Sequence, residues 1–164
     1  MYSMNSFLVL AFIGGLVGTV LMDAIKYVGH KMRLIGGVKM DMLGRWALGM
    51  YRGKFVYADI HDADGYPNEI AVGWLFHYFT GGLVALAYPF LLLILGIPLQ
   101  EAHLMHAILF GLGTSVLPWF VVYPAFGKGW FGAKAPKAAK PVLTSLVSHT
   151  FYGAGIGLMM LTAM

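Results

Sequence analysis

The sequence predicts an all-α, polytopic membrane protein with four transmembrane helices, and its hydropathy, low charge content and charge placement support this prediction. Of its 164 residues, 59% are hydrophobic and 11% are charged, and the mean hydropathy is +0.75. Soluble domains usually contain about 25% charged residues, so these charges are too few to cover a water-facing surface. The length is that of a single membrane domain covering residues 1–164.

Four apolar segments are long enough to cross the hydrocarbon core of a bilayer, which takes about 20 helical residues. They cover Phe7–Gly29, Glu69–Ile97, Ala102–Phe126 and Pro141–Met164. Pro118 and Pro124 are expected to interrupt the third segment, because proline removes a helical hydrogen bond.

Lysine and arginine are confined to two regions of the chain. Seven of them lie within residues 26–54 and four within residues 128–140. Because these residues concentrate on the cytoplasmic side of a membrane protein, the connections 30–68 and 127–140 are expected in the cytoplasm and both termini outside. This asymmetry accounts for the basic pI of about 9.3, so no nucleic-acid partner is predicted.

The first of these connections contains an apolar stripe with helical spacing. Met42, Trp46 and Met50 recur every four residues, with charged residues at other positions, which predicts an amphipathic helix. The helix either lies in the headgroup plane of the membrane or packs beneath the bundle, and the same stripe fits both placements. In the second connection, lysines next to an aromatic residue fit a contact to anionic lipid. The residues expected at the lipid interface are Arg45, Trp46, Lys128 and Trp130.

Three ionisable residues stand out inside the predicted spans, where each costs about 2.5–3.5 kcal/mol at mid-helix. Asp23, His77 and His149 lie at similar distances from the cytoplasmic ends of their spans. With a rise of about 1.5 Å per residue, all three are roughly 10–12 Å deep. They are therefore expected in one polar layer, supported by Tyr78, Thr80 and Thr114.

Several chemistries use two imidazoles and a carboxylate at one depth. His77 and His149 could ligate a haem iron or a chlorophyll-type magnesium, and with Asp23 they could hold a divalent metal. The three residues could also relay protons or bind a transported ion. A purely structural layer of interhelical hydrogen bonds, with no cofactor, is equally compatible with the pattern.

Glycines line the first and fourth spans. The pairs Gly14/Gly18 and Gly153/Gly157 are each four residues apart, a spacing that lets helix backbones approach closely. These faces either close the bundle internally, which is the default expectation, or join it to another protein.

Motifs of known enzymes are absent from the sequence. It contains no Gly-x-Ser-x-Gly elbow, no His-Glu-x-x-His pair, no phosphate-binding loop and no dinucleotide fingerprint. The absence of cysteine excludes thiolate metal sites and thiol nucleophiles. A non-catalytic protein is therefore expected more than an enzyme.

A set of motifs extends along nearly the whole chain. The most specific is Gly73-Trp74-x-x-His77-Tyr78, and others are Gly44-Arg45-Trp46, Pro67-x-Glu69, Gly127-x-Gly129 and Ser145-Leu146-x-x-His149. Together they resemble a bacterial family of small inner-membrane proteins, the domain of unknown function two-nine-three-eight. Tyr123 departs from the family pattern, which has glutamine there. The resemblance implies a four-span protein of the bacterial inner membrane and brings no activity.

The expected function is that of an accessory or assembly subunit of a larger membrane complex. Small size, thin loops and glycine-lined helices favour it, and a metal, haem or pigment could be bound at the histidine layer. The alternative is an oligomeric ion or small-solute transporter with Asp23, His77 and His149 on its pathway. Expected partners are the lipid bilayer and either further copies of the chain or other subunits.

Overall fold

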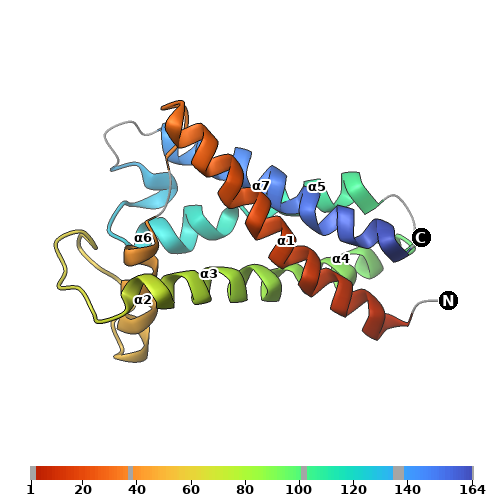
Figure 1. The fold of residues 1–164 in the computed structure, drawn as a ribbon, viewed down its shortest axis with the longest axis horizontal. Helices are drawn as coiled ribbons and strands as arrows, with labels where there is room; N and C mark the ends of the chain where they lie inside the picture. Colours follow the sequence, from red (N-terminus) through yellow and green to blue (C-terminus); the bar gives the residue numbers. More distant parts are fainter. Residues whose placement is uncertain (1–2, 37–38, 101–102, 135–138, 164) are drawn as a thin grey trace. The chain divides into compact units, whose positions relative to one another are not determined.

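The computed structural model describes residues 3–36, 39–100, 103–134 and 139–163 of the chain. Their regular structure is helical. In chain order the elements are α1 (Met4–Lys31), α2 (Met40–Tyr51), α3 (Glu69–Ala85), α4 (Ala87–Ile94), α5 (His103–Gly113), the π-helix η1 (Pro118–Val122), α6 (Tyr123–Ala125), the 3-10 helix η2 (Trp130–Gly132), α7 (Ala139–Met160) and the 3-10 helix η3 (Leu161–Ala163) (Figure 1).

Four helical segments of the described residues are long and apolar enough to cross a membrane. They are Met4–Lys31, Glu69–Ile94, Leu104–Ala125 and Ala139–Met160. They coincide closely with the four predicted spans, so the all-α class with four candidate transmembrane helices is confirmed. The predicted span ends at Ala102 and Met164 lie outside the described residues.

Internal contacts divide the chain into two compact units. Unit 1 consists of Met1–Ile25, Tyr78–Thr114 and Val147–Met164, and unit 2 consists of Lys26–His77 and Ser115–Leu146. A single membrane domain over residues 1–164 stays a prediction.

Unit 1 has a core of aromatic and aliphatic side chains from α1, α3, α4, α5 and α7 (Figure 1). Tyr88 is fully buried, and its ring lies 5.4 Å from the ring of Phe110. Pro89, also buried, explains why the second span is interrupted. It has no N–H to donate to the carbonyl of Ala85, and α3 ends at that residue before α4 begins at Ala87.

Glycines bring the helix backbones of unit 1 into contact. A Cβ atom at Gly18 of α1 would collide with the carbonyl oxygen of Tyr152 on α7, and one at Gly15 would collide with that of Gly81 on α3. A Cβ at Gly153 of α7 would likewise collide with the backbone of α5. The glycine faces of the first and fourth spans therefore close unit 1 internally, as expected by default.

The third span is distorted where its prolines lie, in unit 2. The N–H of Tyr123 bonds to the carbonyl of Pro118, five residues earlier, and residues 118–122 form the π-helix η1. Pro118 and Pro124 have no N–H with which to continue an α-helical ladder, so the predicted interruption is confirmed. Such π-helical turns are rare and are frequent at functional sites.

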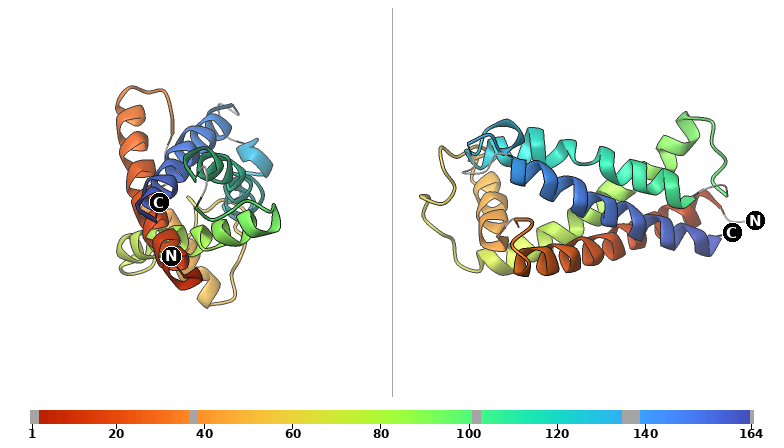
Figure 2. Two further views of the ribbon diagram at one scale, coloured as in Figure 1. Left: turned by 90° about the vertical axis from the view of Figure 1, so that its right-hand side faces the viewer. Right: turned by 90° about the horizontal axis from the view of Figure 1, so that it is seen from above.

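The helix predicted within the connection 30–68 is present as α2, which packs against the first turns of α3 in unit 2 (Figure 2). The two backbones touch, because a Cβ at Gly44 would collide with the carbonyl oxygen of Glu69 and one at Gly73 with that of Met40. Any larger residue at either glycine would force the helices apart.

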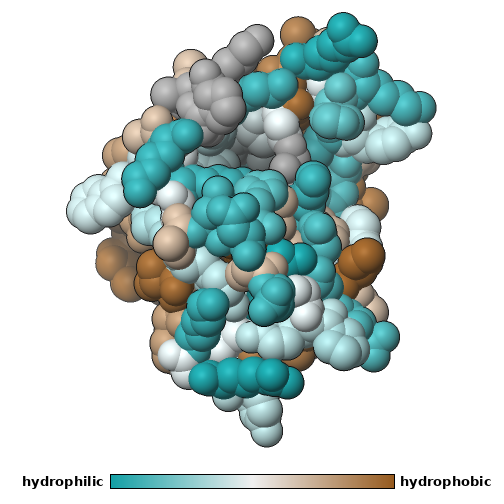
Figure 3. All heavy atoms as spheres, turned by 90° about the vertical axis from the view of Figure 1, so that its left-hand side faces the viewer, coloured by the Kyte–Doolittle hydropathy of each residue, from teal (hydrophilic) through white to brown (hydrophobic). Residues whose placement is uncertain are grey.

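The apolar stripe of α2 forms the core of unit 2. Trp46 is buried, and its ring lies 5.9 Å from that of Phe76 and 5.8 Å from that of Phe126. Of the two placements that the stripe allows, α2 therefore packs its stripe against protein. On the face drawn in Figure 3, hydrophilic side chains predominate over hydrophobic ones.

Candidate functional site

Asp23 of α1 and Tyr78 of α3 meet inside unit 1. Both residues are half-buried, the Oδ2 atom of Asp23 is inaccessible to solvent, and the two side chains are hydrogen-bonded to each other. A carboxylate only accepts hydrogen bonds, so the Tyr78 hydroxyl is the donor. The acidic group of the first span therefore has a local partner, which a charged group in a span requires.

His149 of α7 is bonded to Thr114, also in unit 1. Its Nδ1 lies 2.8 Å from Thr114 Oγ1, and the same hydroxyl donates to the carbonyl oxygen of Gly111 at 2.6 Å. A hydroxyl has one proton and a carbonyl can only accept, so Nδ1 of His149 must donate to Thr114. In its neutral form the imidazole is therefore protonated at Nδ1, with the lone pair on Nε2. Its ring lies 6.1 Å from that of Tyr152.

The assignment of this tautomer predicts the effect of Thr114→Val. Valine keeps the shape of threonine but cannot accept from Nδ1, so His149 should lose its preference for protonation at that nitrogen. In ¹⁵N NMR spectra of histidine-labelled protein in detergent, His149 should show a protonated Nδ1 in the wild type and a mixture of tautomers in the variant. Thr80→Val, on a half-buried threonine of α3, is the matched control. An unchanged His149 spectrum in Thr114→Val would contradict the assignment.

The other two residues of the predicted polar layer belong to different units. His77 is half-buried on the part of α3 that belongs to unit 2, and Thr80 is half-buried in unit 1. Among the described residues, no group of three or more His, Asp or Glu side chains is placed to hold a metal ion. The geometry therefore lends no support to the predicted metal site of Asp23, His77 and His149.

Arg45 of α2 joins three segments of unit 2. Its guanidinium forms a bidentate pair with the Glu69 carboxylate at 2.8 and 3.0 Å, and its Nη1 donates to the carbonyls of Ile60 and Ala63 at 2.9 and 2.7 Å. The Tyr66 N–H donates to the same carboxylate at 3.0 Å. The pair is largely shielded from water, with side-chain exposures of 13% and 14%. The bond to Glu69 raises the pKa of Arg45 above its ordinary value.

The segment after α2 is also fixed through its backbone. Trp46 Nε1 donates to the carbonyl of Phe55 at 2.9 Å, and the Tyr57 N–H donates to the carbonyl of Ala125 at 2.8 Å. Burial raises the pKa of the Tyr57 hydroxyl above its ordinary value. Together with the Arg45–Glu69 pair, these bonds give this part of the connection 30–68 a defined conformation.

These contacts give Arg45 and Trp46 partners within the protein, and their contact with lipid stays a prediction. The sequence places both at the lipid interface, but Trp46 lies in the core of unit 2 and Arg45 is paired with Glu69. An apolar stripe fits lipid and protein equally well, so its periodicity does not distinguish them. The sequence did contain a signal for the pairing of Arg45 with Glu69. Each residue falls within a family motif, Gly44-Arg45-Trp46 or Pro67-x-Glu69.

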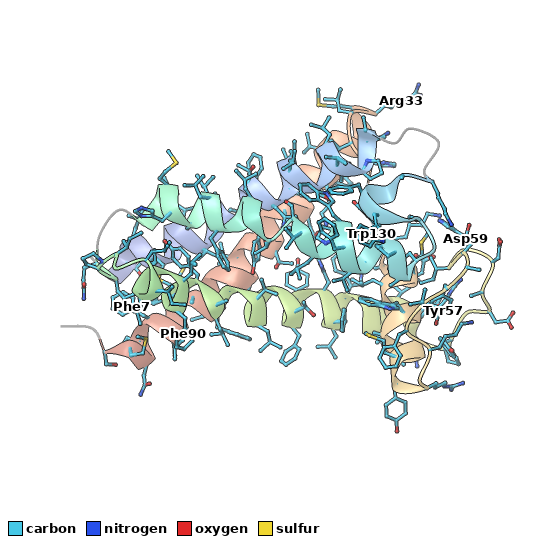
Figure 4. All side chains as sticks on the ribbon, turned by 180° about the vertical axis from the view of Figure 1, so that it is seen from behind. Phe7, Arg33, Tyr57, Asp59, Phe90 and Trp130 are labelled. Atoms are coloured by element: carbon cyan, nitrogen blue, oxygen red, sulfur yellow. The ribbon has the colours of Figure 1, made fainter. Side chains whose placement is uncertain are left out.

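Lys128 and Trp130, the other residues expected at the lipid interface, lie in the connection after α6 (Figure 4). Trp130 is largely exposed, and its ring lies 5.4 Å from that of Phe120. Burial lowers the pKa of Lys128 below its ordinary value, and the negative charge of Asp59 opposes this shift. Contact of Lys128 and Trp130 with lipid stays a prediction.

Comparison with known proteins yields a family. No curated protein and no solved structure matches the chain. A family model described as a protein of unknown function (DUF2938) matches residues 12–163. This is the family that the sequence motifs resemble.

Proposed function

Because the chain belongs to DUF2938, a family of proteins of unknown function, we propose a role from its own geometry: a non-catalytic accessory or assembly subunit of a larger membrane complex. In this proposal the protein resides in a bacterial cytoplasmic membrane. The connections 30–68 and 127–140 lie in the cytoplasm, where Lys and Arg concentrate, and both termini lie outside. The observation that carries the proposal is a group of exposed apolar side chains close together in the sequence of unit 2, here called the apolar patch.

The apolar patch consists of Tyr51, Phe55 and Val56, whose exposures are 92%, 59% and 67%. These residues lie at the end of α2 and directly after it, outside the four candidate spans. The hydrocarbon core of the bilayer therefore does not cover them in the proposed topology. Apolar side chains exposed together and rimmed by polar residues mark interaction sites.

The backbone beneath the patch is held in place, and its rim is cationic. The Lys54 N–H donates to the carbonyl of Gly49 at 2.8 Å. The Lys54 ammonium lies 4.3 Å from the centre of the Tyr57 ring, and the Arg52 guanidinium lies 4.7 Å from that of Tyr66. An apolar centre with a polar rim is typical of protein interfaces, and a preformed backbone reduces the entropy lost on binding.

A cross-linking experiment tests this interface. Because the chain has no cysteine, Val56→Cys introduces its only thiol, which can be labelled with benzophenone-maleimide. On irradiation of native membranes, we expect a product of discrete mass, larger than the 17.9 kDa protomer by one polypeptide. The expected reason is that a partner subunit lies on the patch.

The matched control is Asp62→Cys, which places the label at an exposed position of the same connection. It should give little or none of the discrete product. If Val56→Cys yields only lipid adducts, or if both positions yield the same products, the patch is not a subunit interface and the proposed function fails.

The geometry gives less support to an oligomeric transporter that uses Asp23, His77 and His149. In unit 1 the backbones of neighbouring helices touch at their glycines. Asp23 and His149 are each bonded to a neighbouring side chain, as expected of polar groups that join helices. A haem, pigment or metal bound by the two histidines is likewise not required for a subunit role.

A further inference from the structure

Two buried hydrogen-bond donors of unit 2 have no acceptor among the residues that the structure describes. Ser115 is fully buried. Its Oγ and the Nε1 of Trp119 are both inaccessible to solvent and bonded to no described protein atom. The backbone N–H of Trp119 donates to the backbone carbonyl of Ser115 at 3.3 Å. This is a helical spacing of four residues, which puts both side chains on one face.

Such donors are costly within a span, because the hydrocarbon core offers no water to replace a missing partner. Buried polar groups in proteins therefore nearly always have a partner, either protein or an ordered water. An indole N–H can only donate, and a serine hydroxyl can donate as well. The group that would satisfy both residues is therefore a hydrogen-bond acceptor. It is expected to be neutral, because two neutral donors do not compensate the cost of burying a charge.

The surroundings of Trp119 have further features of a binding site. Trp119 lies in the π-helix η1, and π-helical turns are frequent at functional sites. Its ring lies 5.3 Å from that of Phe131, a residue in the left-handed conformation with φ of 57°. Left-handed residues other than glycine are strained and cluster at ligand sites. The ring of Phe131 provides an apolar surface beside the Trp119 indole.

We propose that Ser115 and Trp119 bind a neutral oxygen acceptor within the third span. The oxygen belongs either to the carbonyl group of a membrane-soluble molecule or to an ordered water, and both present the same chemistry to the two donors. This site is independent of the apolar patch and of the proposed subunit role.

The sign of a change in thermal stability tests the proposal. Trp119→Phe removes the N–H and keeps an aromatic ring, and Ser115→Ala removes the hydroxyl. With an acceptor bound, each variant loses a hydrogen bond and its Tm in detergent should fall. If the donors are orphaned instead, their removal should leave Tm unchanged or raise it, because an unsatisfied buried donor destabilises the fold. That result would overturn the proposal. Trp130→Phe, at an exposed position, is the matched control.

A spectroscopic measurement separates a lost hydrogen bond from a packing defect in these variants. The indole N–H of Trp119, identified in ¹⁵N–¹H spectra by its absence in Trp119→Phe, should resonate at the downfield position of a bonded N–H. A resonance at the position of an unbonded N–H would overturn the proposal whatever the Tm values show.

Mass spectrometry of organic extracts then identifies the source of the oxygen. A carbonyl compound that the wild type and Trp130→Phe retain, and that Trp119→Phe and Ser115→Ala lose by about tenfold or more, is the ligand. A bonded Trp119 N–H without any such compound assigns the site to an ordered water, as the proposal allows.

Discussion

Arg45→Met should lower the free energy of unfolding by about 1–3 kcal/mol, because it leaves the half-buried Glu69 carboxylate without its charged hydrogen-bond partner. The carbonyls of Ile60 and Ala63 lose their donor at the same time. Since Arg45 joins α2 to α3 and to the segment between them, the residues after α2 should detach early. Denaturant unfolding in detergent, followed by the fluorescence of the buried Trp46, measures the loss.

Two variants serve as controls for this prediction. Arg45→Lys keeps the charge but lacks the planar fork that fits a carboxylate, so it should recover only part of the lost stability. Arg52→Met removes an exposed arginine just beyond the same helix and should change the free energy of unfolding by no more than about 0.5 kcal/mol. If Arg45→Met and Arg52→Met have the same free energy of unfolding, the ion pair does not hold unit 2 together.

Gly18→Ala should lower the free energy of unfolding by about 1–3 kcal/mol, because its Cβ would collide with the backbone of α7 in a close-packed core. The colliding atoms are the carbonyl group and ring of Tyr152, and a carbonyl within a helix cannot turn away. The loss would occur although alanine favours a helix over glycine by about 1 kcal/mol. Gly18→Leu should lose more, because it adds three further carbon atoms at the same contact.

Gly113→Ala should have the opposite effect on the free energy of unfolding. A Cβ at Gly113 of α5 meets no heavy atom within 4 Å, so the helix preference of alanine should leave this variant as stable as the wild type or slightly more stable. Thermal unfolding of the purified variants in one detergent compares them directly. Equal Tm values for Gly18→Ala and Gly113→Ala would refute the close helix contact in unit 1.

The membrane spans were predictable because a chain in lipid must satisfy its own backbone hydrogen bonds, which a long apolar helix does within one segment. The interruption of the third span was predictable for a similarly local reason, since the missing N–H belongs to Pro118 itself. The break near Pro89 follows the same rule.

The candidate site was predictable only in part. The helical rise placed Asp23 and His149 at similar depth, and the supporting residues Tyr78 and Thr114 were identified, but not which of them bonds to which. That pairing depends on how each helix is rotated about its axis, which side-chain packing decides. Glu69 was missed as the partner of Arg45 because 24 residues separate them.

By itself, the sequence determined an all-α membrane protein of this family, with four candidate spans, basic connections and glycine faces suited to close helix contact. Hydropathy, charge and residue size are local properties, and they suffice for those conclusions. Only the tertiary structure decided that α2 packs against protein and that the glycine faces close unit 1. It also decided that Ser115 and Trp119 are buried without an acceptor among the described residues. Those outcomes depend on which side chains meet across long separations, and close packing of each unit selects one such set of contacts.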